Sequence, residues 1–139
     1  MINFKFRLEK LLEYRRLQEK WAKDAYLEVI VRKFEAEAEI ESIKRRRETA
    51  LRSSPSALDE LVSLDAYMTK LDDDQRASET AESVISTEVE TALDEWTVTR
   101  MQVAAIEKLR EAELAEWTLN ENRREQSELD EWSSQRRAA

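Results

Sequence analysis

The sequence predicts an all-α protein: an antiparallel two-helix coiled-coil hairpin with a longer, projecting C-terminal helix. Three observations lead to this prediction. The 139 residues include no glycine and one proline, Pro55, although these are the usual residues of tight turns and strand bends. Charged residues make up 39% of the chain and apolar ones 41%, a mixture typical of long helices. Apolar side chains also recur at helical spacing on both sides of Pro55.

The first helix is expected from about Phe4 to about Arg52. A 3.5-residue step through this stretch gives Leu8, Leu11, Arg15, Gln18, Ala22, Ala25, Val29, Arg32, Ala36, Glu39 and Ile43. Seven of these eleven residues are apolar, as expected for the contact line of a coiled coil with polar interruptions. Leu12, Ile40 and Leu51 widen the line.

The second helix, at about 57–137, is expected to follow a turn at about 53–56. Ser54 is the expected cap of this helix, because its hydroxyl can accept a hydrogen bond from a free backbone N–H group. Pro55 then takes the first helical position, where a missing N–H group costs nothing. Together the two helices make residues 1–139 a single coiled-coil hairpin.

The second helix carries the strongest apolar line of the chain. This line consists of Ile85, Val89, Ala92, Trp96, Thr99, Val103 and Ile106. Its weak point lies at about 72–83, where the same line reads Gln75, Ser78 and Glu82. A kink, a second loop and a solvated stretch of continuous helix are all compatible with this polar interruption.

The charges favour pairing of the two arms within one chain. Residues 1–52 contain 14 Lys and Arg against 10 Asp and Glu, and residues 53–139 contain 9 against 21. A hairpin therefore lays a basic arm along an acidic one. The overall charge of −8 argues against nucleic acid as the main partner, since phosphate contacts need a dense basic face.

Folding at Pro55 pairs residues 2–52 with about 57–107 and leaves a C-terminal stretch without an intrachain partner. We expect this stretch to be a projecting helix rather than the counterpart of an extra element at 56–75. Trp117 and Trp132 fall within it. Each follows a leucine by three residues, so the two are either anchors for a partner's groove or contacts to the first helix or a second copy.

The composition argues against an enzyme. Without histidine or cysteine, the chain lacks the usual bases, nucleophiles and metal ligands. Consecutive carboxylates at Asp72, Asp73 and Asp74 point in different directions on a helix, so we expect neither a metal nor a cofactor. No apolar run approaches the roughly 18 residues of a membrane span, and the absence of cysteine fits a cytoplasmic protein.

Basic residues gather at two places on the first helix. Those at 44–47 either offset the dipole at the helix C-terminus or bind an acidic partner. Arg15, Arg16, Lys20 and Lys23 lie towards the other end. Arg15 falls on the contact line, where a charge is either a register device or a contact to another molecule.

Three segments together have a recognisable pattern. Residues 4–13, FKFRLEKLLE, pass from aromatic and basic residues into a leucine-rich stretch. Residues 67–72, YMTKLD, join an aromatic residue to a leucine and an acidic one, and residues 122–132, NRREQSELDEW, end on a bulky side chain. In this order and spacing the chain resembles the FliJ family of the flagellar type III export apparatus over nearly its full length.

The resemblance implies a non-enzymatic hairpin like the central shaft of a rotary ATPase. Such a protein inserts into the hexameric export ATPase FliI, contacts the export gate protein FlhA and escorts export chaperones, in the cytoplasm beside the membrane-embedded apparatus. The implied gate-binding residues are Ile40, Ile43, Tyr67 and Leu71. The chain departs from the family pattern at Ala36, Arg47, Asp74 and Ser78. The implied ATPase-ring residues are Phe4, Phe6, Arg15, Arg16 and Trp117.

Three other functions are compatible with the sequence. An injectisome stalk of the YscO-like class shares the leucine-rich basic start. A self-associating structural coiled coil would pair its apolar lines between chains, whereas the stalk is expected to be a monomer when free. A peripheral membrane helix would use Phe4, Phe6 and Leu8 as its apolar anchor.

Overall fold

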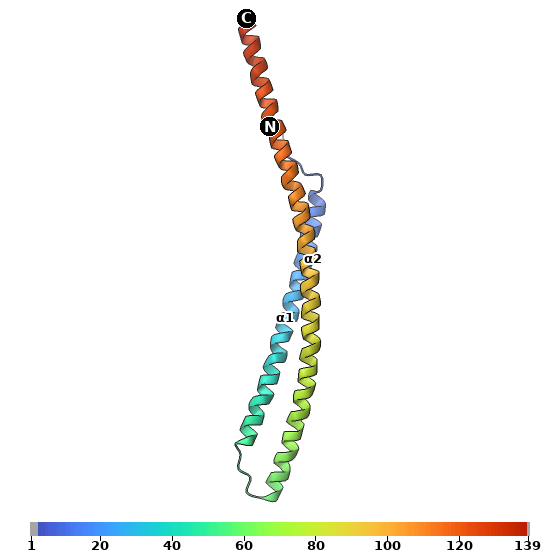
Figure 1. Ribbon diagram of the computed structural model, residues 1–139, viewed down its shortest axis with the longest axis vertical. Coiled ribbons are helices and arrows are strands. Elements are labelled where there is room, and N and C mark those ends of the chain that lie inside the picture. The colour runs from blue at the N-terminus through green and yellow to red at the C-terminus, as the bar shows by residue number, and fades with distance from the viewer. Residues whose placement is uncertain (1–2, 139) are drawn as a thin grey trace. The chain divides into compact units, whose positions relative to one another are not determined.

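The computed structural model describes residues 3–138, which form two long helices packed antiparallel as a hairpin (Figure 1). Helix α1 spans Glu9–Leu51 and contains 43 residues, and helix α2 spans Leu58–Ala138 and contains 81. The predicted all-α hairpin with a longer second helix is thereby confirmed.

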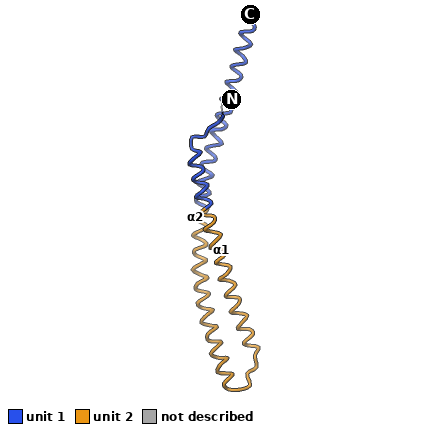
Figure 2. The backbone as a smooth tube through the Cα atoms, turned by 180° about the vertical axis from the view of Figure 1, so that it is seen from behind, with its two compact units in different colours: residues 1–20, 97–139 blue, residues 21–96 orange. Residues whose placement is uncertain are grey.

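The hairpin divides into two compact units (Figure 2). The first unit contains the residues up to Lys20 together with those from Thr97 onward, and the second unit is Trp21–Trp96. Each unit combines a stretch of α1 with a stretch of α2, and the second also contains the connection between the helices.

The buried and half-buried positions of α2 follow the predicted contact line. In the second unit they include Leu64, Met68, Leu71, Gln75, Ser78, Glu82, Ile85, Val89, Ala92 and Trp96. In the first unit they include Thr99, Val103, Ile106, Arg110, Glu113 and Trp117. The steps alternate between three and four residues, which is the spacing of a coiled-coil seam.

The seam of α1 agrees with the predicted line at seven of its eleven positions. Leu11, Ala25, Arg32 and Glu39 are exposed, and their places are taken by Leu12, Tyr26, Lys33 and Ile40. Both sets satisfy an average step of 3.5 residues, so periodicity does not distinguish them. Packing does, because Leu12 is fully buried and Tyr26 stacks on Trp96 with ring centroids 5.3 Å apart.

The register of the hairpin differs from the predicted one. Folding at Pro55 placed residue 52 opposite about residue 57, but Arg47 already pairs with Asp72 in the second unit. In that unit the first turns of α2 therefore extend past the end of α1 (Figure 1). No residue among those described adopts a positive φ angle. Without such a residue the chain reverses through an extended connection rather than a tight turn.

Helix α2 begins three residues after the proline rather than at it. The predicted arrangement, with Ser54 as the cap and Pro55 in the first turn, is wrong. Instead, the backbone N–H group of Ser56 donates to Glu60 Oε2 at 2.9 Å. A carboxylate thus reaches back to a free backbone donor, as in a capping box, and its negative charge suits the helix N-terminus.

Helix α1 begins at Glu9, not at about Phe4 as predicted. The preceding residues alternate in burial: Phe4 is half-buried, Lys5 exposed, Phe6 buried and Arg7 exposed. A two-residue period is that of an extended segment, whereas a helix would place Phe4 and Phe6 on different faces. Burial of both aromatic rings against the first unit therefore outweighs the helical tendency of this segment.

Helix α2 is continuous through the polar stretch at 72–83, for which the sequence left three alternatives. Hydrogen bonds between side chains one turn apart bridge the stretch. Gln75 Nε2 donates to Glu79 Oε1 at 2.8 Å, and Ser86 Oγ donates to Glu82 Oε1 at 2.9 Å. Such pairs support a helix whose seam lacks apolar residues.

Candidate partner-binding sites

The four predicted gate-binding residues all belong to the second unit, but only Tyr67 is well exposed. Ile43 and Leu71 are each 1% exposed and belong to the seam, and Ile40 is half-buried. Tyr67 is 40% exposed. The structure therefore places two of the four side chains in the core of the hairpin, where they hold the helices together and support the surface above them.

A groove lies next to Tyr67 in the second unit. It has a volume of about 530 Å³ and runs between the last turns of α1 and the first turns of α2. Apolar and basic side chains share its walls. The lining residues are Ser42, Arg45, Arg46, Thr49, Ala50, Ser53, Leu64 and Tyr67. The groove could not be predicted from the sequence, because its two walls meet only in the observed register.

Three of the four basic residues at 44–47 pair with acidic side chains, and none of the four lies in the last turn of α1. The last turn of α1 contains no basic residue, and the dipole interaction fades beyond the last turn. Arg46 lies 3.3 Å from Glu39 Oε1, and Lys44 lies 3.7 Å from Glu41 Oε1. The dipole interpretation of these residues is thus wrong.

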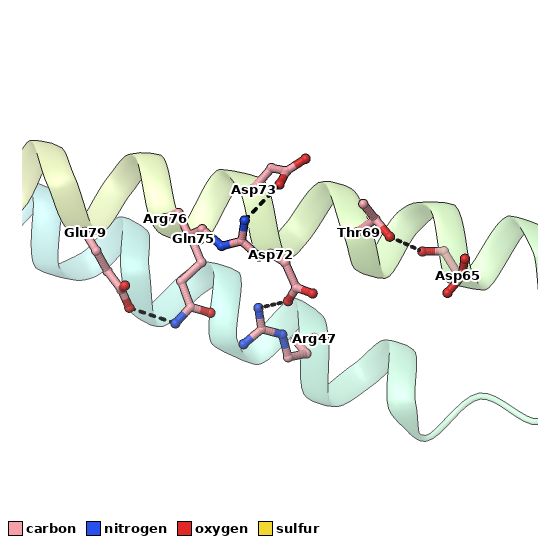
Figure 3. Close-up of polar contacts among 8 residues, drawn as sticks. All are labelled: Arg47, Asp65, Thr69, Asp72, Asp73, Gln75, Arg76 and Glu79. Carbon is pink, nitrogen blue, oxygen red and sulfur yellow. Dashed lines mark hydrogen bonds and ion pairs between the residues drawn. The ribbon is translucent and has the colours of Figure 1, made fainter.

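A polar layer interrupts the seam below the groove (Figure 3). Arg47 forms an ion pair with Asp72 across the helices, while Asp73 lies 3.8 Å from Arg76 on α2 itself. Two buried atoms of the layer, Arg47 Nε and Gln75 Oε1, have no hydrogen-bond partner. A buried polar atom without a partner costs roughly 1–3 kcal/mol, so this layer is a weak point of the hairpin.

Replacing the two residues that hold the unpartnered atoms, by Arg47→Leu and Gln75→Leu, is expected to stabilise the hairpin by about 1–2 kcal/mol. The double change removes both unsatisfied atoms and supplies apolar volume to the seam. Asp72 loses its partner Arg47, but its side chain is 49% exposed and stays solvated. Urea denaturation followed by circular dichroism measures the effect. A midpoint that falls instead of rising would show that the polar layer stabilises the native register.

In the first unit, the N-terminal segment is fastened to α2 by aromatic and charged contacts. The ring of Phe4 lies 5.9 Å from that of Trp117, and the guanidinium of Arg110 lies 5.8 Å from the Phe4 ring. Arg110 also pairs with Glu9 at 3.2 Å. Trp117 therefore has an intrachain partner, contrary to the prediction that it lies in an unpaired stretch. The prediction failed because it used the wrong register.

Two of the predicted ring-binding residues, Phe6 and Arg15, contribute little to the exposed surface of the first unit. Phe6 is buried, and Arg15 donates from Nη1 to both Gln18 Oε1 and Gln102 Oε1 at 3.1 Å. Arg15 is thus a satisfied polar residue of the seam, as the register-device interpretation expects. Both residues contribute to the shape of this end of the hairpin rather than to its exposed surface.

Arg16 and the residues after Trp117 provide the accessible groups of the first unit. Arg16 is half exposed, and its Nη2 atom lies 3.2 Å from Glu107 Oε1 across the helices. The final turns of α2 are exposed, with Leu129 at 60% and Trp132 at 56%. The guanidinium of Arg136 covers the Trp132 ring at 5.0 Å. These exposed groups can bind a partner without rearrangement of the seam.

Among residues 3–138, no helix is long and apolar enough to cross a bilayer. The same residues contain no cluster of three or more side chains suited to holding a metal ion. The accessible features are thus a groove with aromatic, basic and apolar walls in the second unit and exposed basic and apolar groups along α2 and α1 in the first. Surfaces of this kind bind other proteins.

Comparison with known proteins identifies one family. The family model described as Flagellar FliJ protein matches residues 4–139 of the chain. The searches of curated proteins and of solved structures gave no match.

Proposed function

The chain belongs to the flagellar FliJ family, and from this premise we propose that it is the central stalk of a hexameric flagellar export ATPase. Membership makes the protein a non-enzymatic structural component of the flagellar export apparatus. Our proposal adds a partner and a mode of action: the hairpin binds inside the ring of the ATPase FliI and raises its rate of hydrolysis.

The observation that carries the proposal is the continuity of α2 beyond its last aromatic contact with the N-terminal segment. This helix has 81 residues without a break, and its final turns after Trp117 are exposed. A protein that acts inside a ring needs a stiff element with an accessible surface. Such a protein also needs surface charges that can exchange their ion-pair partners as the ring subunits change conformation, and it needs no active site.

For the ring contact we favour Arg16, Trp117 and the exposed turns that follow it. Arg16 is paired with Glu107 at the surface, where ion pairs are weak, typically about 0–1 kcal/mol. A subunit of the ring can therefore take over either partner at little cost. Phe4, Phe6 and Arg15 support this contact indirectly, since they fix the N-terminal segment and the seam beneath it.

For the gate contact, with FlhA as the partner, we favour the groove beside Tyr67. The exposed edge of Tyr67 and the guanidinium groups of Arg45 and Arg46 give the groove both an aromatic anchor and positive charge. An acidic, partly apolar segment fits such a surface. In this arrangement Ile40, Ile43 and Leu71 do not line the groove and act through the packing of the two helices. The proposed setting is cytoplasmic, at the membrane-embedded apparatus, with export chaperones as further partners.

The proposed ATPase contact is tested by phosphate release. We expect the protein to raise the hydrolysis rate of its cognate hexamer and to release no phosphate alone. Arg16→Glu is expected to reduce the stimulation about fivefold, because it replaces a cation that faces the ring. Arg76→Glu is the matched control: Arg76 is an exposed arginine of the second unit with a weak partner, Asp73. Equal stimulation by both variants would refute the assignment of Arg16, and a lack of stimulation by the wild type would refute the stalk function.

A further inference from the structure

Helix α1 carries a second apolar face in the second unit, separate from the seam. It consists of Leu27, Ile30, Val31 and Phe34, which we call the outer stripe. Leu27, Val31 and Phe34 are 46%, 55% and 62% exposed, and Ile30 is half-buried. The spacing i, i+3, i+4, i+7 places all four on one side of a helix. Neither proposed binding surface includes these residues, and the hairpin does not need them for its core.

The outer stripe is nearly symmetric along the helix axis. Read in either direction, its apolar residues follow the same spacing of three, one and three. Its flanking charges are opposite in sign. Lys23 precedes Ile30 by seven residues, and Glu37 follows Ile30 by seven. An antiparallel copy of the same stripe therefore presents an acidic group to each basic one and an apolar residue to each apolar one.

We propose that the outer stripe binds the outer stripe of a second copy of the chain, antiparallel, around a two-fold axis near Ile30 and Val31. In this arrangement Leu27 packs against Phe34 of the second copy, and the reciprocal contact forms by symmetry. Lys23 lies opposite Glu37 of the second copy. Glu37 is available for this contact, because its intrachain pair with Lys33 is long, at 3.9 Å, and lies at the surface.

The small size of the stripe makes this association weak. Four apolar side chains from each copy bury less surface than the roughly 1,200–2,000 Å² of a stable complex. We therefore expect a dissociation constant on the order of 100 μM, within the range of transient contacts. At micromolar concentration a dimer of this affinity is almost fully dissociated, so the protein is still expected to be a monomer there. The outer stripe lies apart from the seam, so the association neither depends on the stalk function nor competes with the contacts between the two helices.

Sedimentation equilibrium of the full-length chain between about 10 μM and 1 mM tests the proposal. The weight-average mass of the wild type is expected to rise from that of one chain towards that of two. Val31→Ser is expected to weaken the association at least tenfold, since it places a hydroxyl at the centre of the interface. Val84→Ser is the matched control, because Val84 lies on α2 and is 56% exposed, almost equal to Val31 at 55%.

A charge exchange tests the antiparallel orientation. Lys23→Glu and Glu37→Lys are each expected to weaken the association about fivefold, since each turns two attractive contacts into repulsive ones. The double variant is expected to regain the wild-type affinity, because the attraction is restored with reversed signs. A parallel dimer would place like charges together in both the wild type and the double variant, and would show no such loss and recovery.

Three results would overturn the proposal. They are a wild type that stays monomeric at 1 mM, equal effects of Val31→Ser and Val84→Ser, and a double charge variant that fails to recover. Circular dichroism of each variant accompanies the measurements. Because these positions are solvent-exposed, helix content and melting temperature are expected to stay unchanged, which separates lost association from lost folding.

Discussion

Leu71→Ala is expected to destabilise the hairpin by about 3 kcal/mol, within the roughly 2–5 kcal/mol observed for buried leucines. Leu71 is 1% exposed and lies in the seam of the second unit, where α1 contributes the equally buried Ile43. Truncation removes apolar contacts and leaves a space that two stiff helices cannot easily close. Urea denaturation followed by circular dichroism at 222 nm measures the change in the free energy of unfolding.

Leu61→Ala is the matched control for this prediction. Leu61 lies on the same helix, ten residues earlier, but is 52% exposed, so its truncation is expected to cost less than about 1 kcal/mol. The pair also separates packing from binding at the proposed gate surface. If Leu71→Ala left stability unchanged while abolishing gate binding, Leu71 would be a contact residue and its burial in the seam would be wrong.

Trp96→Ala is expected to destabilise the hairpin by about 3 kcal/mol as well, since large aromatic residues in a seam lose both burial and stacking. Trp96 packs on Tyr26 of α1 with ring centroids 5.3 Å apart and an interplanar angle of 31°. It thus joins the two helices within the second unit. For a chain of this size, such a loss lowers the melting temperature by roughly 10 °C.

Trp132→Ala serves as the control for Trp96→Ala. Trp132 lies in the exposed final turns of α2, is 56% exposed and has the guanidinium of Arg136 of the same helix over its ring. Its removal is expected to shift the melting temperature by no more than about 2 °C, the usual range of surface substitutions. A melting temperature unmoved by Trp96→Ala would show that Trp96 is not part of the seam.

The fold class and the seam of α2 could be predicted because they depend on local properties. The lack of glycine and the single proline exclude most alternatives to long helices, and the line from Ile85 to Ile106 has one continuous apolar phase. On α1 the phase was ambiguous. Leu11 and Leu12 are adjacent, and only contact with the partner helix decides that Leu12 is buried and Leu11 exposed.

The register could not be predicted, because it depends on the path of the connection rather than on periodicity. Moving the chain reversal past Pro55 shifts every pair across the hairpin. This single error placed Trp117 in an unpaired stretch, although it contacts Phe4, and concealed the groove beside Tyr67. A signal for the correct register was present in the charges, since Arg32 lies opposite Glu88 and Arg16 opposite Glu107 only in that register.

The sequence could indicate candidate binding residues but not which of them are exposed. Ile43 and Leu71 were expected at one binding site, yet both are buried. Sequence spacing indicates which residues share a helix face, but exposure depends on which face the other helix covers. The same reason explains Phe6, whose alternation with Lys5 and Arg7 indicated an extended segment that the helical prediction overlooked.

The central claim is that an intact hairpin, formed within one chain, acts on the ATPase ring. Single cysteines in place of Arg32 and Glu88, whose side chains lie 2.9 Å apart across the helices, allow the two arms to be joined by a short bis-maleimide, since the chain has no other cysteine. The decisive measurement is phosphate release by the cognate export ATPase in the presence of the joined monomer. We predict that it stimulates hydrolysis as strongly as the unjoined variant. Loss of stimulation on joining, or joined products containing two chains, would contradict the claim.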